Sequence, residues 1–256
     1  MTASAPAAQS RRPLIEPSLL ALAAIAWVAT IAVARDMGNG PGTMGLGVVA
    51  FIGSWTLMMA AMMFPSIAPF ASLYTRTFIG HRGRRVGLLA GGYLAVWATA
   101  GLGAFALARG AEELAERAPG WAHGAAVASC FACALYQVTP LKDRCLQHCR
   151  SPLGHLVRYA SFRRRLADTR VGIAHGGWCL ACCWSLMLLL VTFGVMNVIA
   201  MVSLAAVIVT EKIAKPGRWF SIAVGAGALA LGVAIWIDPS IAHGLYLDPT
   251  QARMDM

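Results

Sequence analysis

The sequence predicts an all-α integral membrane protein, a polytopic transmembrane helix bundle with about seven spans. Its 256 residues are 58% hydrophobic and only 12% charged, whereas soluble domains carry about 25% charged residues. Several apolar stretches reach the roughly 20 residues that a helix needs to cross a bilayer. Basic residues gather in alternate connections between these stretches. The composition therefore excludes a soluble enzyme and a disordered chain.

Apolar stretches, and the charged or proline residues that end them, define the expected spans in order. The first four and the last are expected at about 18–34, 43–64, 86–108, 121–140 and 219–237. Residues 176–213 form one stretch without charge as far as Glu211, about twice the length of a span. We expect a hairpin there, with its turn near Gly194 and Asn197. The alternative is one long tilted helix.

The distribution of positive charge predicts the orientation of the chain. Cytoplasmic loops of membrane proteins carry an excess of Lys and Arg. Such residues dominate the N-terminal segment and the connections after the second, fourth and sixth spans. We therefore expect the inner (cytoplasmic) membrane, with the N-terminus in the cytoplasm and the C-terminus outside. The expected domains are a flexible tail at 1–17, one membrane domain at 18–238 with a basic loop at 140–175, and an exterior tail at 239–256.

All seven cysteines lie between residues 130 and 183. Cys130 and Cys133 fall inside the fourth span, where a buried thiol commonly acts as a small apolar side chain. The other five are expected at the cytoplasmic ends of two spans: Cys145, Cys149, Cys179, Cys182 and Cys183. Stable disulfides are rare on that side of the membrane. Their gathering there therefore favours metal or redox chemistry. Where the chain is helical, spacings of three and four residues place thiols on one face.

Other soft ligands accompany the thiols. His175 precedes Cys179 by four residues, and the second span holds four methionines in six positions: Met58, Met59, Met62 and Met63. Thiolates and thioethers together select Cu(I) over hard cations. We therefore predict a copper site formed by those five cysteines, His175 and the four methionines, with zinc as the second candidate. The alternative for the methionines is packing. Glu211 and Lys212 are expected to form a local ion pair.

Three blocks of the sequence carry a family resemblance. They are the Met-rich block Trp55–Pro65, the block Tyr136–Pro152 and the block Gly172–Lys212. These blocks resemble the family of predicted metal-binding integral membrane proteins, a domain of unknown function. The resemblance covers about residues 45–215 and implies a membrane location and a metal site. Ala181 stands where similar proteins often have Gly, a change that removes no ligand.

Three functions agree with these features. The first is binding of a soft transition metal, most readily copper, in metal transport, delivery or homeostasis. The second is a non-catalytic assembly or scaffold subunit for a membrane metalloenzyme. The third, and the only enzymatic one, is a thiol-redox relay, because Cys-x-x-Cys pairs act as dithiols. The expected partners are the lipid bilayer and a metallochaperone or membrane metalloenzyme. The basic loop is expected to contact lipid headgroups and not nucleic acid.

Overall fold

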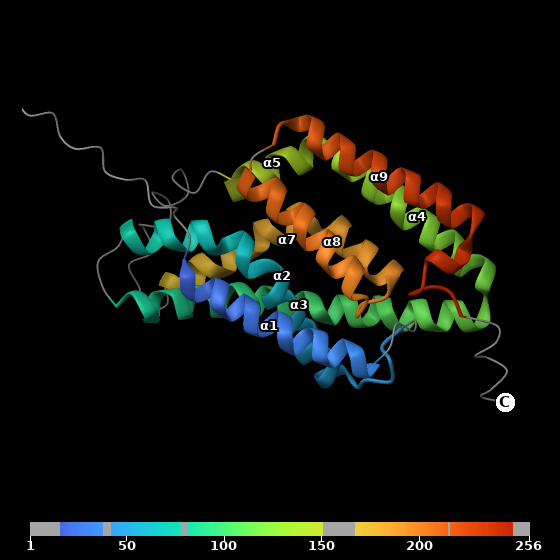
Figure 1. The fold of residues 1–256 in the computed structure, drawn as a ribbon, viewed down its shortest axis with the longest axis horizontal. Helices are drawn as coiled ribbons and strands as arrows, with labels where there is room; N and C mark the ends of the chain where they lie inside the picture. The colour runs from blue at the N-terminus through green and yellow to red at the C-terminus, as the bar shows by residue number, and fades with distance from the viewer. Residues whose placement is uncertain (1–15, 38–41, 78–80, 151–166, 215, 248–256) are drawn as a thin grey trace, which may run out of the picture.

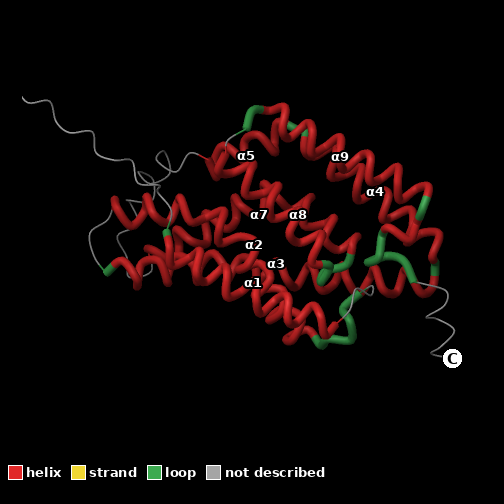
Figure 2. Tube along the Cα trace, in the orientation of Figure 1, coloured by secondary structure: helices red, strands yellow, loops and turns green. Residues whose placement is uncertain are grey.

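A computed structural model describes residues 16–37, 42–77, 81–150, 167–214 and 216–247. Every regular element in these ranges is a helix (Figure 2), which confirms the all-α class. Most of the expected N-terminal tail, the second half of the expected exterior tail and the middle of the basic loop lie outside the described residues. Within the described ranges, five helices are long and apolar enough to cross a membrane, or up to six if one bent helix pair counts as a span.

The first three helices pack along one another. Helices α1 (Pro17–Met37) and α2 (Val48–Thr77) lie side by side (Figure 1). The second span was expected to end at about residue 64, before Pro65, but α2 continues through Pro65 and Pro69. Apolar surroundings favour this continuation, because backbone groups that leave a helix there find no water to bind. Helix α3 (Arg82–Arg117) has 36 residues and is therefore about 54 Å long.

A sharp bend separates the next two helices. Helix α4 (Pro119–Gln137) and helix α5 (Pro140–Arg150) meet at 66°. Pro140 can begin α5 because the first helical position needs no backbone N–H. The expected loop at 140–175 therefore starts with a helix. Helix α9 (Arg218–Ile237) runs along α4, and the short η2 (Pro239–Ile241) follows it (Figure 1).

The long apolar stretch folds as the expected hairpin. Helix α7 (Ala167–Phe193) is followed by α8 (Val198–Val209) and the π-helical turn η1 (Thr210–Ala214). Gly194 takes a φ of 96° in the turn, a conformation that other residues rarely adopt. Asn197 Oδ1 accepts from the Ala200 N–H at 3.1 Å and caps α8. With 12 residues, α8 is too short to count as a span by length, so the structure yields fewer spans than the expected seven.

Glycines allow α3 and α7 to approach closely. A Cβ at Gly172 would overlap the carbonyl oxygen of Leu89, and one at Gly92 would overlap that of Thr169. Small residues at helix crossings let two backbones come together in membrane proteins. This packing brings the buried Tyr93 of α3 against α7, where the cysteines lie.

Candidate functional site

Helix α7 carries three buried cysteines, more than three turns beyond its start. Cys179, Cys182 and Cys183 are each at most 1% exposed. The thiols of Cys182 and Cys183 both donate to the carbonyl oxygen of Cys179, at 3.2 and 2.9 Å. Two thiols therefore fold back on the backbone of their own helix.

Helix α5, which precedes α7 in the chain, contributes a further cysteine to this place. Cys149 Sγ lies 3.8 Å from Cys182 Sγ. When two thiolates bind one ion with metal–sulfur distances of about 2.3 Å and a tetrahedral angle between them, their sulfurs lie roughly 3.8 Å apart. Cys145, one turn earlier on α5, is 3% exposed. The structure thus brings the two cysteine pairs of the sequence prediction to one place.

Two residues that sequence analysis did not select contact Cys179. Lys212 Nζ donates to Cys179 Sγ at 2.7 Å. The Tyr93 hydroxyl lies 2.8 Å from the same sulfur, and either atom could donate. Lys212 is 6% exposed and Tyr93 is fully buried. The sequence offers one signal for Lys212, a cation next to Glu211 at the end of the long uncharged stretch.

The expected ion pair between Glu211 and Lys212 is wrong. Glu211 Oε2 instead accepts from Lys142 Nζ of α5 at 2.8 Å, and both side chains are nearly inaccessible. Arg150 Nε donates to the Glu211 carbonyl oxygen at 2.7 Å. Adjacent side chains on a helix point in different directions, so Glu211 reaches α5 while Lys212 reaches α7. The pair fastens α5, and with it Cys149, to η1.

Some buried polar side chains lack hydrogen bonds, and one of them belongs to this ion pair. Within the described ranges, Glu211 Oε1 and both polar side-chain atoms of Gln137 are buried without a hydrogen-bond partner. Buried polar atoms normally have partners, because an unpaired one costs roughly 1 to 3 kcal/mol. The ion pair of Lys142 with Glu211 is therefore not fully satisfied.

The predicted histidine and methionine ligands lie in packed surroundings. The His175 ring stacks on Phe70 with centroids 4.2 Å apart and lies 6.2 Å from the Tyr93 ring. The four methionines are fully buried in the same apolar core as the cysteines: Met58, Met59, Met62 and Met63. Packing alone accounts for this burial. Their role as ligands, like that of His175, stays a prediction.

The cysteines of α5 and α7 form what we call the sulfur cluster: Cys145, Cys149, Cys179, Cys182 and Cys183. Their side chains are not arranged as a complete metal site. Among the described residues, no three or more His, Cys, Asp or Glu side chains are placed to hold a metal ion together. The hydrogen bonds explain this arrangement, because the Cys182 thiol points toward a carbonyl and Lys212 lies beside Cys179. A third sulfur could join an ion at Cys149 and Cys182 after a change of side-chain rotamer.

The two cysteines of α4 lie among other partners. Cys130 and Cys133 are fully buried. A Cβ added at Gly232 of α9 would lie 3.1 Å from Cys130 Cβ, so Cys130 fills helix-packing space. Cys133 Sγ lies 3.8 Å from Ser185 Oγ. These contacts agree with the role of small apolar side chains.

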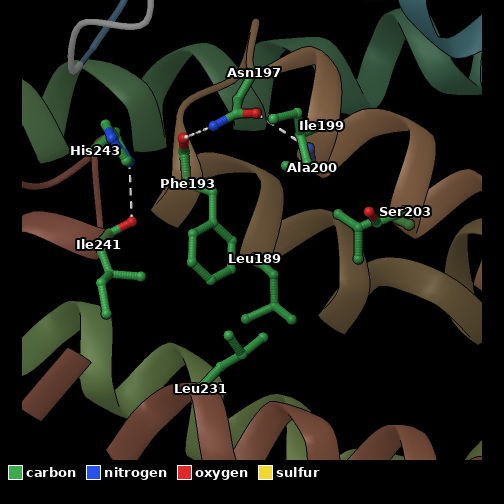
Figure 3. Close-up of a pocket in the computed structure, with 10 residues that line it drawn as sticks. Leu189, Phe193, Asn197, Ile199, Ala200, Ser203, Leu231, Ile241 and His243 are labelled. Atoms are coloured by element: carbon green, nitrogen blue, oxygen red, sulfur yellow. Dashed lines mark hydrogen bonds between the residues drawn. The ribbon is translucent and has the colours of Figure 1, made fainter. Parts of the chain in front are cut away.

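A cavity of about 280 Å³ lies at the other end of the α7–α8 hairpin (Figure 3). Its walls are mainly apolar, and Asn197, Ser203 and His243 add polar groups. Asn197 Nδ2 donates to the Phe193 carbonyl oxygen at 3.2 Å, and its Oδ1 caps α8. Asn197 therefore serves the turn. None of the described residues that line this cavity is a cysteine, so it is separate from the sulfur cluster.

Comparison with known proteins identifies the family. The model of the PpoB2 family, described as copper chaperone, matches residues 52–235, more than half of the chain. No curated protein and no solved structure matches the chain. The matched region contains the Met-rich block, all seven cysteines and Lys212. It agrees with the metal-related family that the three sequence blocks indicate, and it points to copper. The chain belongs to the copper chaperone family PpoB2.

Proposed function

We propose that this protein is a multi-pass membrane protein that binds Cu(I) through Cys149, Cys179 and Cys182 and passes it to a partner. The observation that carries the proposal is the 3.8 Å distance between sulfurs of α5 and α7, which suits two ligands of one ion. Membership of a copper chaperone family supports copper as the metal. Thiolate ligands in a buried site favour a soft ion.

The proposed topology has seven crossings. Helices α1, α2, α3, α4, α7 and α9 each cross once. The seventh crossing is α8 with η1, because Gly194 and Asn197 turn the chain back and η1 extends α8 as far as Ala214. The N-terminus then lies in the cytoplasm of the inner membrane and the C-terminus outside, as the basic connections favour. The sulfur cluster lies toward the cytoplasmic side.

Ligand exchange explains how such a site could release its cargo. Copper held by two or three thiolates can pass to an incoming sulfur ligand without becoming free. Cys145 and Cys183 lie one turn and one residue from the proposed ligands, so they can replace a ligand during exchange. His175 would adjust the site, and the four methionines of α2 would hold or pass the ion. The recipient or donor is a metallochaperone or a membrane metalloenzyme.

Metal analysis of the protein tests the proposal. The full chain is purified in detergent under anaerobic, reducing conditions and loaded with Cu(I) against a competing chelator. We expect bound copper in the wild type and in the control Cys130→Ser/Cys133→Ser, and little in Cys149→Ser/Cys182→Ser. Equal copper in both double variants would refute the proposed ligands. No copper in the wild type would refute the function.

The same sulfur distance also favours a thiol-redox relay as a second function. Cys149 and Cys182 need only approach from 3.8 Å to the roughly 2.05 Å of a disulfide. A relay cycles between dithiol and disulfide, whereas a copper carrier keeps both thiols reduced. Alkylation of thiols in cells, with and without prior reduction, separates the two. An oxidised Cys149–Cys182 pair in growing cells would favour the relay.

A further inference from the structure

The charge of Lys212 is directed at sulfur. Lys212 lies in the π-helical turn η1, and such turns occur often at functional sites. Its ammonium contacts Cys179 Sγ at 2.7 Å. The adjacent Glu211 is paired with Lys142. Within the described part of the chain, Lys212 forms no salt bridge with a carboxylate, and its ammonium contacts the sulfur of Cys179.

Geometry limits how far this charge can lie from a bound ion. An ion bound to Cys179 lies about 2.3 Å from the sulfur. Because Lys212 Nζ is 2.7 Å from the same sulfur, the ammonium lies no more than about 5 Å from the ion. Lys212 is 6% exposed, and buried charges are screened much less than exposed ones.

We infer that Lys212 determines charge selectivity, making the sulfur site favour monovalent soft cations over divalent ones. The inference rests on the proposed function, because it takes Cys179 as one of the ligands. For an identical ligand set, a divalent ion meets one more unit of repulsion from Lys212 than a monovalent ion does. At about 5 Å and an effective dielectric constant of about 20, that unit corresponds to on the order of 100-fold in affinity.

Two contacts of Cys179 allow the charge to be separated from the packing. Tyr93 lies 2.8 Å from the same sulfur as a neutral group. Removing its hydroxyl therefore disturbs the site without changing the charge. Lys212→Met keeps an unbranched apolar side chain and removes the charge, while Lys212→Arg keeps the charge. If the charge of Lys212 determines the preference for monovalent ions, Lys212→Met and Lys212→Arg should differ in that preference. If packing determines it, they should not differ.

The experiment measures the affinity of the purified full chain, in detergent, for two monovalent and two divalent metal ions. Dissociation constants are obtained by chelator competition for Cu(I) and Ag(I), which are monovalent, and for Cd(II) and Zn(II), which are divalent. In Lys212→Met we expect the preference for Ag(I) over Cd(II) to fall on the order of 100-fold. In Lys212→Arg and Tyr93→Phe we expect it to stay within about threefold of the wild type.

The outcomes separate the two proposals. An unchanged ratio in Lys212→Met, or an equal fall in Tyr93→Phe, overturns the selectivity role while the copper site stands. If the wild type binds no more Cu(I) than Cys149→Ser/Cys182→Ser does, the proposed function fails and the selectivity role fails with it. Size-exclusion profiles report folding. If Lys212→Met aggregates, Lys212→Gln makes the same comparison, because it is also uncharged.

Discussion

Replacement of Glu211 should strongly destabilise the helix bundle, although this residue is not a proposed copper ligand. Lys142 and Glu211 are paired at 2.8 Å with side chains 0% and 2% exposed. In Glu211→Gln the Lys142 ammonium stays buried without a counter-charge. Breaking one partner of a buried pair costs about 3 to 5 kcal/mol. We expect a loss of that size in the free energy of unfolding.

The double variant separates the cost of an unpaired charge from the value of the pair. Replacing both partners of a buried ion pair with uncharged side chains is often nearly neutral. Lys142→Met/Glu211→Leu should therefore be more stable than Lys142→Met alone or Glu211→Leu alone, the two single variants that complete the cycle. The control is the exposed pair of Arg218 and Asp143, with side chains 60% and 30% exposed. Asp143→Asn should cost at most about 1 kcal/mol.

Unfolding in mixed micelles, followed by the fluorescence of the eight tryptophans, provides the free energies. The coupling between Lys142 and Glu211 is the difference between the double variant and the summed single variants, and we expect about 2 kcal/mol or more. The reasoning is refuted if Glu211→Gln costs less than about 1 kcal/mol. It is also refuted if the double variant costs as much as the two single variants together.

Three further predictions concern packing, oxidation and the turn. Gly172→Ala should lower the free energy of unfolding by about 1 to 3 kcal/mol, because its added Cβ would overlap α3. The control Gly177→Ala should be neutral or stabilising, because no atom lies near its added Cβ. Thermal unfolding compares the two variants. Mild oxidation of the metal-free chain should join Cys149 to Cys182 before any other pair; mass spectrometry of the digested protein would contradict this if another pair formed first. Asn197→Ala should cost about 1 kcal/mol by loss of the α8 cap, and a denaturation midpoint equal to that of the wild type would exclude this role.

Much of the helical architecture follows from hydropathy, and its errors have clear causes. The α7–α8 turn was predictable because Gly194 and Asn197 are strong turn residues in an apolar stretch. The end of α2 was misplaced because proline breaks helices in water but not reliably in apolar surroundings. Helix α5 was missed because its polar sequence has the composition of a loop. Its helical state is fixed by tertiary contacts to α7 and η1.

The candidate site was predictable in its sulfur content but not in its pairings. Spacing indicates that Cys145 and Cys149 would share a face if their segment were helical. It cannot indicate that Cys149 lies opposite Cys182, because that depends on the angle at which α5 meets α7. Lys212 was assigned to its neighbour in sequence, since nearest-neighbour reasoning has no information on distant sulfurs. Long-range partners of this kind require the fold.

The sulfur pair joins positions 33 residues apart in the chain. An ion bound there would close a loop, and closing a loop of this length removes about 4 kcal/mol of conformational entropy from the unfolded chain. Metal clips that close long loops stabilise proteins in this manner. On the proposed ligand set, loaded and empty forms of the chain would therefore differ in resistance to unfolding. The bound metal ion would thus determine how long each molecule persists before cellular proteases degrade it.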